Sequence, residues 1–99
     1  MPQASFDLEE VRRIVQSRLG GHPAHVYLFG SWARDSATHT SDIDVGVMPL
    51  APLPEGLLSE IREALEESLV VYDVDLVDLS EAAPGFRQRV LEEGILWIG

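Results

Sequence analysis

The feature that most constrains the fold is the alternation of strand-like and helix-like segments within only 99 residues. Strand-like segments carry apolar residues at alternate positions or in one short run, whereas helix-like segments repeat them every three or four positions. Their order predicts an α+β fold, a small mixed β-sheet with helices packed on it. A chain this short has room for one modest core, so we expect residues 1–99 to form a single domain. We expect strands at residues 25–29, 42–48, 70–79 and 95–98, and helices at 7–19, 31–34, 56–69 and 80–93.

The expected ends of these elements depend on local start and stop signals. Asp7 followed by Glu10 forms a capping-box pattern that predicts the start of the first helix. Leu69 closes the apolar face of the third expected helix, and Ser80 is expected to cap the last one. Three prolines within residues 49–54 predict a loop, because proline does not fit a central strand or a helix interior.

The charge balance excludes several classes of function. Seventeen acidic residues face seven basic ones, all of them arginine, which gives a net charge of −10. This balance argues against binding to long nucleic acid, because cationic side chains must neutralise the phosphates. The absence of lysine excludes a P-loop lysine and a Schiff base, and the absence of cysteine excludes a thiolate nucleophile. Since we find neither a signal peptide nor an apolar run long enough to span a bilayer, we expect no membrane association and a cytoplasmic location.

A Gly-Ser pair directly follows the first expected strand. Gly30 allows a sharp backbone turn, and Ser31 offers a hydroxyl and an N–H at an expected helix start, which together predict a cradle for phosphate. Arg34 is placed to reach a phosphate oxygen. The alternative interpretations are a plain turn for the Gly-Ser pair and a surface ion pair between Arg34 and Asp35.

Two carboxylates occupy one side of the next expected strand. Asp42 and Asp44 are two positions apart and therefore share a face, while Ile43 between them points into the core. Adjacent carboxylates repel each other unless they are protonated or share a cation. Mg²⁺ suits this arrangement, because it binds one or two carboxylates and completes its shell with phosphate and water. The alternative is a pair of ordinary solvent-exposed strand residues.

The third expected strand offers a third carboxylate. Asp73 and Asp75 share one face of it, and Asp78 lies on the other. Three carboxylates around two divalent ions are suited to in-line phosphoryl or nucleotidyl transfer. From the strand pattern alone, both Asp73 and Asp75 remain candidates for the third position.

Taken together, these residues resemble the DNA polymerase beta-like nucleotidyltransferases, and in particular their minimal nucleotidyltransferase (MNT) branch. The resemblance covers nearly the whole chain. Segment 74–79 is similar to the third motif of that branch, whose first aspartate is catalytic, so the resemblance favours Asp75 over Asp73. The residues that carry the resemblance are Phe29-Gly30-Ser31-x-Ala33-Arg34, Ser41-Asp42-x-Asp44 and Val74-Asp75-Leu76-Val77-Asp78-Leu79.

The resemblance implies a nucleotidyltransferase fold, ATP as the donor substrate, and a Mg²⁺ site that holds two ions. Short members of this branch are typically paired with a HEPN-type protein in a toxin–antitoxin system. The MNT protein acts there as the antitoxin and transfers AMP to a tyrosine of the HEPN ribonuclease toxin. In this chain the resemblance makes Asp42, Asp44 and Asp75 the catalytic residues and metal ligands, and makes Gly30, Ser31 and Arg34 the nucleotide-binding residues.

Two departures from the family pattern and two alternative functions accompany this interpretation. Position 35 is Asp where the family often has Gly, and position 32 is Trp where a polar residue is common. Trp32 is expected either to stack on a base or partner, or to pack beside the strand. The main alternative function is a weakly catalytic or non-catalytic module that neutralises its partner by occlusion, its acidic surface mimicking RNA. Transfer to tRNA or to a small antibiotic is a third possibility.

Overall fold

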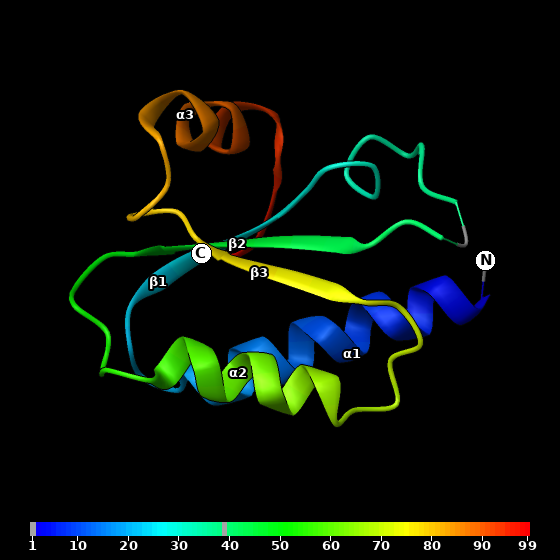
Figure 1. Cartoon of the computed structure of the whole chain (residues 1–99), viewed down its shortest axis with the longest axis horizontal. Helices are drawn as coiled ribbons and strands as arrows, with labels where there is room; N and C mark the ends of the chain where they lie inside the picture. Colours follow the sequence, from blue (N-terminus) through cyan, green and yellow to red (C-terminus); the bar gives the residue numbers. More distant parts are fainter. Residues whose placement is uncertain (1, 39) are drawn as a thin grey trace.

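The computed structural model describes residues 2–38 and 40–99 and contains a four-stranded mixed sheet with the strand order β3-β2-β1-β4 (Figure 1). Strand β1 pairs antiparallel with β2 and β4, and β2 pairs parallel with β3. The α+β class expected from the sequence is confirmed. The elements in chain order are α1 (Pro2–Leu19), β1 (Ala24–Phe29), β2 (Ile43–Pro49), α2 (Leu57–Glu66), β3 (Val74–Asp78), α3 (Pro84–Glu93) and β4 (Ile95–Ile98).

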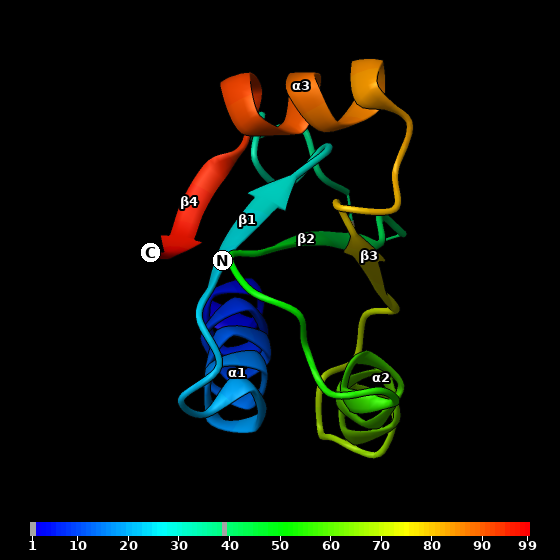
Figure 2. The same cartoon turned by 90° about the vertical axis from the view of Figure 1, so that its left-hand side faces the viewer.

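The helices lie in two layers on either side of the sheet. Helices α1 and α2 cover one face, and α3 lies over the other (Figures 1 and 2). Helix α2 forms the crossover between the parallel strands β2 and β3, which a tight hairpin could not join.

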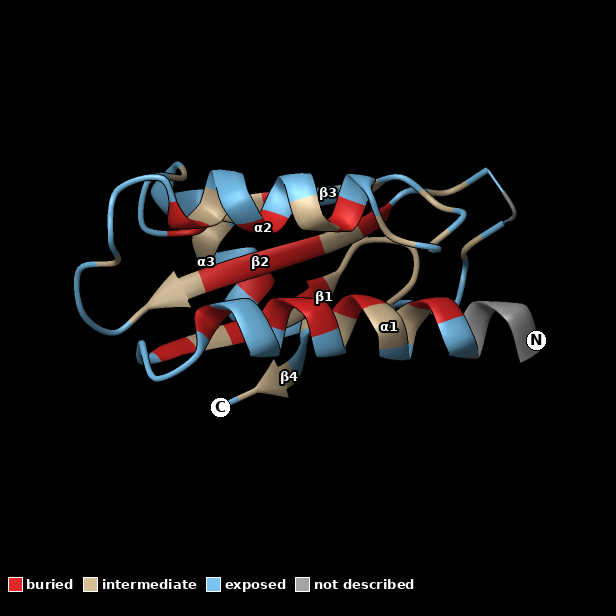
Figure 3. Ribbon diagram, turned by 90° about the horizontal axis from the view of Figure 1, so that it is seen from below, coloured by how far each residue is buried: buried red, intermediate tan, exposed pale blue. Residues whose placement is uncertain are grey.

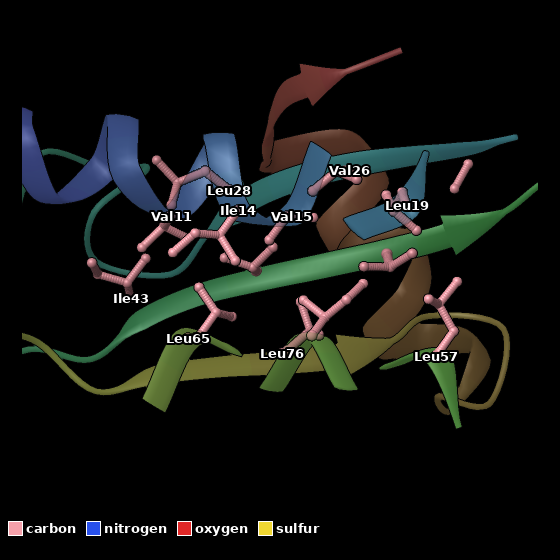
Figure 4. Close-up of a cluster of buried hydrophobic side chains, with 14 residues drawn as sticks. Val11, Ile14, Val15, Leu19, Val26, Leu28, Ile43, Leu57, Leu65 and Leu76 are labelled. Carbon is pink, nitrogen blue, oxygen red and sulfur yellow. The ribbon is translucent and has the colours of Figure 1, made fainter. Parts of the chain in front are cut away.

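The core fills the space between the sheet and the α1–α2 layer, where the buried surfaces of helices and strands face each other (Figure 3). Alternation along β2 builds one side of this core, because Ile43, Val45 and Val47 are fully buried on one face of the strand. The other buried apolar residues of this cluster, most of which Figure 4 labels, are Val11, Ile14, Val15, Leu19, Ala24, Val26, Leu28, Leu57, Ile61, Leu65 and Leu76.

Helix α1 begins earlier than its capping-box pattern predicted. It starts at Pro2, a residue suited to a first helical turn, so the prediction of a start at Asp7 is wrong. Asp7 lies inside the helix and is fully buried. The helix ends at Leu19, as expected. Among the described residues, no helix combines the length and the hydrophobicity that crossing a bilayer requires.

Helix α2 is shorter than expected, and so is the strand after it. The Ser68 hydroxyl donates to the Leu65 carbonyl (2.6 Å) and accepts from the Val70 N–H (3.2 Å), which turns the chain out of the helix. Leu69 is therefore 81% exposed, and its expected place on the buried face is wrong. Strand β3 starts only at Val74, four residues later than expected.

The last helix begins after its expected cap. The amide and hydroxyl of Ser80 both donate to the Asp78 carboxylate, at 2.9 and 2.6 Å, so Ser80 closes a turn at the end of β3. The helix starts at Pro84 with Ala83 as its N-cap, which corrects the expected start at residue 80. Pro49 also differs from expectation, because it is the last residue of β2, opposite Ala24, rather than part of the loop.

Candidate active site

One row of residues crosses three strands on the sheet face opposite the α1–α2 layer. Phe29 at the end of β1 pairs with Asp44 of β2, and Asp44 pairs with Asp75 of β3. Partners in register point to the same face of a sheet, and neighbouring strands are about 4.8 Å apart. The structure therefore brings together Asp44 and Asp75, two aspartates that are 31 positions apart in the sequence.

Asp42 lies just before β2 and is exposed. Because Ile43 is fully buried in the core, Asp42 and Asp44 both lie on the side facing away from it. The Ile43 N–H donates to the Asp73 carbonyl at 2.9 Å, which ties the start of β2 to the residues that lead into β3. The side-by-side placement of Asp42 and Asp44 predicted from strand alternation is consistent with this geometry.

The structure separates Asp73 from Asp75 as candidates for the third carboxylate. Asp75 lies within β3, in register with Asp44, whereas Asp73 precedes the strand and contributes its backbone carbonyl to the sheet. The carboxylate of Asp78 accepts hydrogen bonds from Ser80 at the far end of β3. Asp75 is therefore the β3 aspartate that adjoins Asp44.

The electrostatics of the site centre on Asp44. Burial raises the pKa of the Asp44 carboxyl above its usual range, and the negative charges of Asp75 and Asp42 raise it further. The guanidinium of Arg34 lowers the same pKa. The three carboxylates thus interact through space, and their mutual repulsion makes this face attractive to a cation.

The carboxylates fit a divalent ion that takes part of its coordination shell from the protein and the rest from a substrate. Within residues 2–38 and 40–99, no three Asp, Glu or His side chains converge closely enough to hold a metal ion by themselves. Mg²⁺ does not need such a cage, since it is commonly bound by one or two carboxylates together with phosphate oxygens and water. The Asp42–Asp44 pair matches that chemistry, and the ligand roles of all three aspartates remain predictions.

Gly30 brings the turn after β1 into direct contact with this cluster. Its φ of +75° lies in the left-handed region that favours glycine. A Cβ at this position would overlap with Oδ2 of Asp44 and lie 3.1 Å from its Cγ. Glycine is therefore required at position 30 both by the backbone and by the close approach of Asp44.

The segment after Gly30 is a hydrogen-bonded turn, not the short helix expected at residues 31–34. The N–H groups of Ala33 and Arg34 both donate to the Gly30 carbonyl at 3.2 Å, and the Ser36 N–H donates to the Ser31 carbonyl at 2.9 Å. The amide and hydroxyl of Ser31 have no hydrogen-bond partner within the described part of the chain. They remain available to an anion, although no helix begins there.

The turn also explains one departure from the family pattern. Asp35 adopts φ of +57°, so the backbone here has the conformation for which glycine is the usual residue. Arg34 is exposed, and it makes no ion pair with Asp35 or with any other residue that the structure describes. The surface ion pair considered for Arg34 is therefore not formed.

Trp32 holds the turn against two other segments of the site, and sequence reasoning missed both partners. Its Nε1 donates to the Ser41 carbonyl at 3.3 Å, next to Asp42, and its ring meets that of Tyr72 edge-on at 5.0 Å. The packing interpretation of Trp32 is confirmed. No sequence pattern pointed to Tyr72, because a contact across 40 positions leaves no local signal.

Comparisons with known proteins identify the family of the chain. The model of the family described as polymerase beta, nucleotidyltransferase matches residues 9–98. The protein adenylyltransferase MntA of Shewanella oneidensis is 36% identical over 69 residues, which cover 70% of this chain and 49% of that protein. The chain thus spans about half the length of this relative.

Solved structures resemble the fold over most of the chain. A chain in the crystal structure of a toxin–antitoxin complex with AMP-PNP has a TM-score of 0.71 and 30% identity, covering 89% of this chain and 73% of that one. The structure of the tri-AMPylated Shewanella oneidensis HEPN toxin with MNT antitoxin contains a match with a TM-score of 0.68 and 26% identity, covering 96% and 71%. The resemblance inferred from the motifs is confirmed, and the chain belongs to the polymerase beta nucleotidyltransferase family.

Proposed function

We propose that this protein is a Mg²⁺-dependent nucleotidyltransferase that transfers AMP from ATP to a hydroxyl group, with a tyrosine of a HEPN-type ribonuclease toxin as the preferred acceptor. It acts thereby as the antitoxin of that partner, in the cytoplasm. The observation that carries the proposal is the contact between Gly30 and the Asp44 carboxylate, which joins a phosphate-binding turn to an acidic cluster. Family membership and the relatives described above support the reaction class and the partner.

The turn binds the triphosphate in this proposal. The unpaired amide and hydroxyl of Ser31 donate to phosphate oxygens, and Gly30 lets the backbone come close. The exposed guanidinium of Arg34 provides a charged donor to the phosphates. Asp42 and Asp44 hold Mg²⁺, which when bound neutralises phosphate charge and stabilises the attacking and leaving oxygens.

Asp75 acts on the acceptor side. Its carboxylate is exposed and adjoins Asp44, so a hydroxyl entering beside β3 meets it next to the bound α-phosphate. As Asp75 accepts the hydroxyl proton, the oxygen forms a bond to the α-phosphorus, and the bond from that phosphorus to the bridging oxygen breaks. Pyrophosphate leaves with the electron pair of that bond, and AMP remains on the acceptor.

The test uses ATP labelled on the α-phosphate, the full chain, Mg²⁺ and a HEPN-type partner. The wild type should label the partner, and an Asp42→Ala/Asp44→Ala variant should not. Asp78→Ala is the matched control, since Asp78 lies at the far end of β3, bonded to Ser80. ATP labelled on the γ-phosphate should leave the partner unlabelled. Label transfer that persists in the double variant would refute the assignment.

Occlusion without catalysis is the second candidate, and the charge of the chain favours it. The chain carries a net charge of −10. An acidic surface suits a basic, RNA-cleaving partner. Under this alternative, the complex forms without Mg²⁺ and ATP, and the Asp42→Ala/Asp44→Ala variant still inhibits the partner. Loss of inhibition in that variant, with the complex intact, excludes occlusion.

A further inference from the structure

We propose that the pocket between α3 and the turn after β1 is a pyrophosphate subsite, in which Arg89 joins Arg34 in binding the β- and γ-phosphates and the leaving group. The inference rests on the proposed function and adds a residue that none of the motifs contains. The pocket has a volume of about 210 Å³ and opens beside Gly30, the residue in contact with Asp44. Its lining includes the charged residues Arg34, Arg89 and Glu93 and the aromatic residues Phe29 and Phe86.

Helix α3 is anchored so that Arg89 faces this pocket. The rings of Phe86 and Phe29 meet edge-on at 5.6 Å, which fixes the helix over the end of β1 (Figure 2). Val90, one turn further along, is 4% exposed. Arg89 lies beside these two anchors, whereas Gln88 bonds to Glu92 on the exposed side of the helix. The direction of Arg89 therefore follows from two apolar contacts.

Three arginines have a side-chain hydrogen-bond partner within the described residues, and the two arginines of the pocket have none, although the charge of Arg34 acts on Asp44. Arg13 bonds to Glu10, and the guanidinium of Arg62 donates to the Leu76 carbonyl. Neither Arg34 nor Arg89 makes a hydrogen bond or an ion pair within the described residues.

Two of the seven arginines thus face one pocket that holds a single carboxylate, in a chain whose net charge is −10. This local excess of positive charge, on planar groups that donate two parallel hydrogen bonds, favours a phosphate ligand.

The geometry of the proposed transfer indicates which group enters the pocket. Attacking and leaving oxygens lie roughly in line across the reacting phosphorus. With Asp75 on β3 beside the entering hydroxyl, the leaving group points across β2 towards β1. Two strand spacings separate β3 from β1, about 10 Å, and the pocket begins at the end of β1. Pyrophosphate is the group that leaves in this direction.

The test compares the binding of pyrophosphate, ATP and AMP to the full chain by isothermal titration calorimetry with Mg²⁺ present. Arg89→Ala should weaken the binding of pyrophosphate and ATP about tenfold and change that of AMP little, because AMP has no β- and γ-phosphates. Arg89→Lys should retain part of the affinity. Glu93→Gln should strengthen pyrophosphate binding. Arg87→Ala, on the same helix outside the pocket lining, is the matched control.

Three outcomes overturn the inference. They are no binding of pyrophosphate to the wild type, equal affinities of Arg89→Ala and Arg87→Ala, and an equal loss of AMP binding in Arg89→Ala. The α-label transfer assay separates this failure from failure of the proposed function. If the wild type transfers AMP and the transfer rates of Arg89→Ala and Arg87→Ala are the same, only the subsite is refuted. If the wild type transfers no AMP, the proposed reaction itself is refuted. Arg89 is exposed and Arg87 partly buried, and thermal melts verify that both variants fold.

Discussion

The two faces of β2 differ in burial and in charge, because one packs into the core and the other carries an aspartate beside other carboxylates. Ile43, Val45 and Val47 are fully buried against α1 and α2, while Asp44 on the opposite face has carboxylate neighbours and is partly exposed. Both faces come from the same seven residues. One strand therefore supplies both core packing and the charge of the candidate site. The two are kept apart because successive residues of a strand point to opposite faces.

The two faces of β2 therefore contribute oppositely to stability. The buried face stabilises the fold by removing apolar surface from water. The open face carries a cost, because burial and two like charges raise the pKa of Asp44 and so disfavour its ionised form. Substitutions on one face should therefore change folding, and those on the other should change catalysis with little loss of stability.

The largest effect is expected from Asp44→Asn on AMP transfer. Under the metal-binding role proposed for Asp44, this change removes several kcal/mol of charge stabilisation, so the transfer rate should fall about 1,000-fold. Initial rates with α-labelled ATP measure this effect, with Asp78→Asn as the matched control. A decrease below tenfold would contradict the role assigned to Asp44.

Ile43→Ala should destabilise the fold, because Ile43 lies on the buried face of β2. Truncation of this fully buried side chain should lower the free energy of unfolding by about 2–4 kcal/mol. Val77→Ala on the half-buried opposite face of β3 should cost clearly less. Urea denaturation of both variants tests the comparison, and equal losses would mean that the two faces do not differ as described.

Gly30→Ala tests the contact between the turn and the cluster. The methyl group would overlap with the Asp44 carboxylate and would also occupy a left-handed backbone conformation, so we expect a loss of about 1–3 kcal/mol in stability and a large loss of transfer. Gly20→Ala is the control, since Gly20 has φ of +56° but open space around it. If both variants lose equally in stability, the clash with Asp44 contributes nothing.

The pH dependence of stability should show the cost of the charged face. The pKa of Asp44 is higher in the folded state than the ordinary 3.8, so its ionised form destabilises the fold at neutral pH and its protonated form does not. At pH 7 and without metal, the free energy of unfolding of Asp44→Asn should exceed that of the wild type by at most about 1 kcal/mol. The difference stays this small because solvent screens the charge of the partly exposed Asp44. This advantage should shrink as the pH falls through the raised pKa towards 3.8. Thermal melts across this pH range measure the stability difference between Asp44→Asn and the wild type, with Asp78→Asn as control. A difference that does not change with pH would contradict the explanation.

The smallest effect is expected at Asp35. Asp35→Gly and Asp35→Asn both remove a negative charge next to the turn, so each should tighten ATP binding about twofold. Only the glycine also relieves the left-handed backbone at this position, where asparagine is nearly as well tolerated as aspartate. Calorimetric titration with ATP measures the first effect and thermal melts the second. Unchanged affinity in both variants would remove Asp35 from the account of nucleotide binding.

Local patterns predicted the elements better than their ends. Alternation in residues 42–48 identified β2 and both of its faces, and the strand expected at residues 70–79 contains β3, although β3 begins four residues later than expected. The ends failed where a side chain intervened, because Ser68 terminates α2 through two hydrogen bonds and Ser80 turns back to Asp78. Such bonds depend on where the chain goes next, which a window of sequence does not contain.

Local patterns were enough to predict the α+β class, the family and the candidate residues of the Gly-Ser turn and the Asp-x-Asp pair, because period-two alternation and short motifs are local properties of a chain. Three relations became visible in the folded chain alone: Asp75 rather than Asp73 adjoins Asp44, Trp32 meets Tyr72, and Arg89 lines the same pocket as Arg34. These relations depend on strand register and on the docking of α3 over β1. Both are set by packing between segments tens of residues apart, which leave no periodic signal in the sequence.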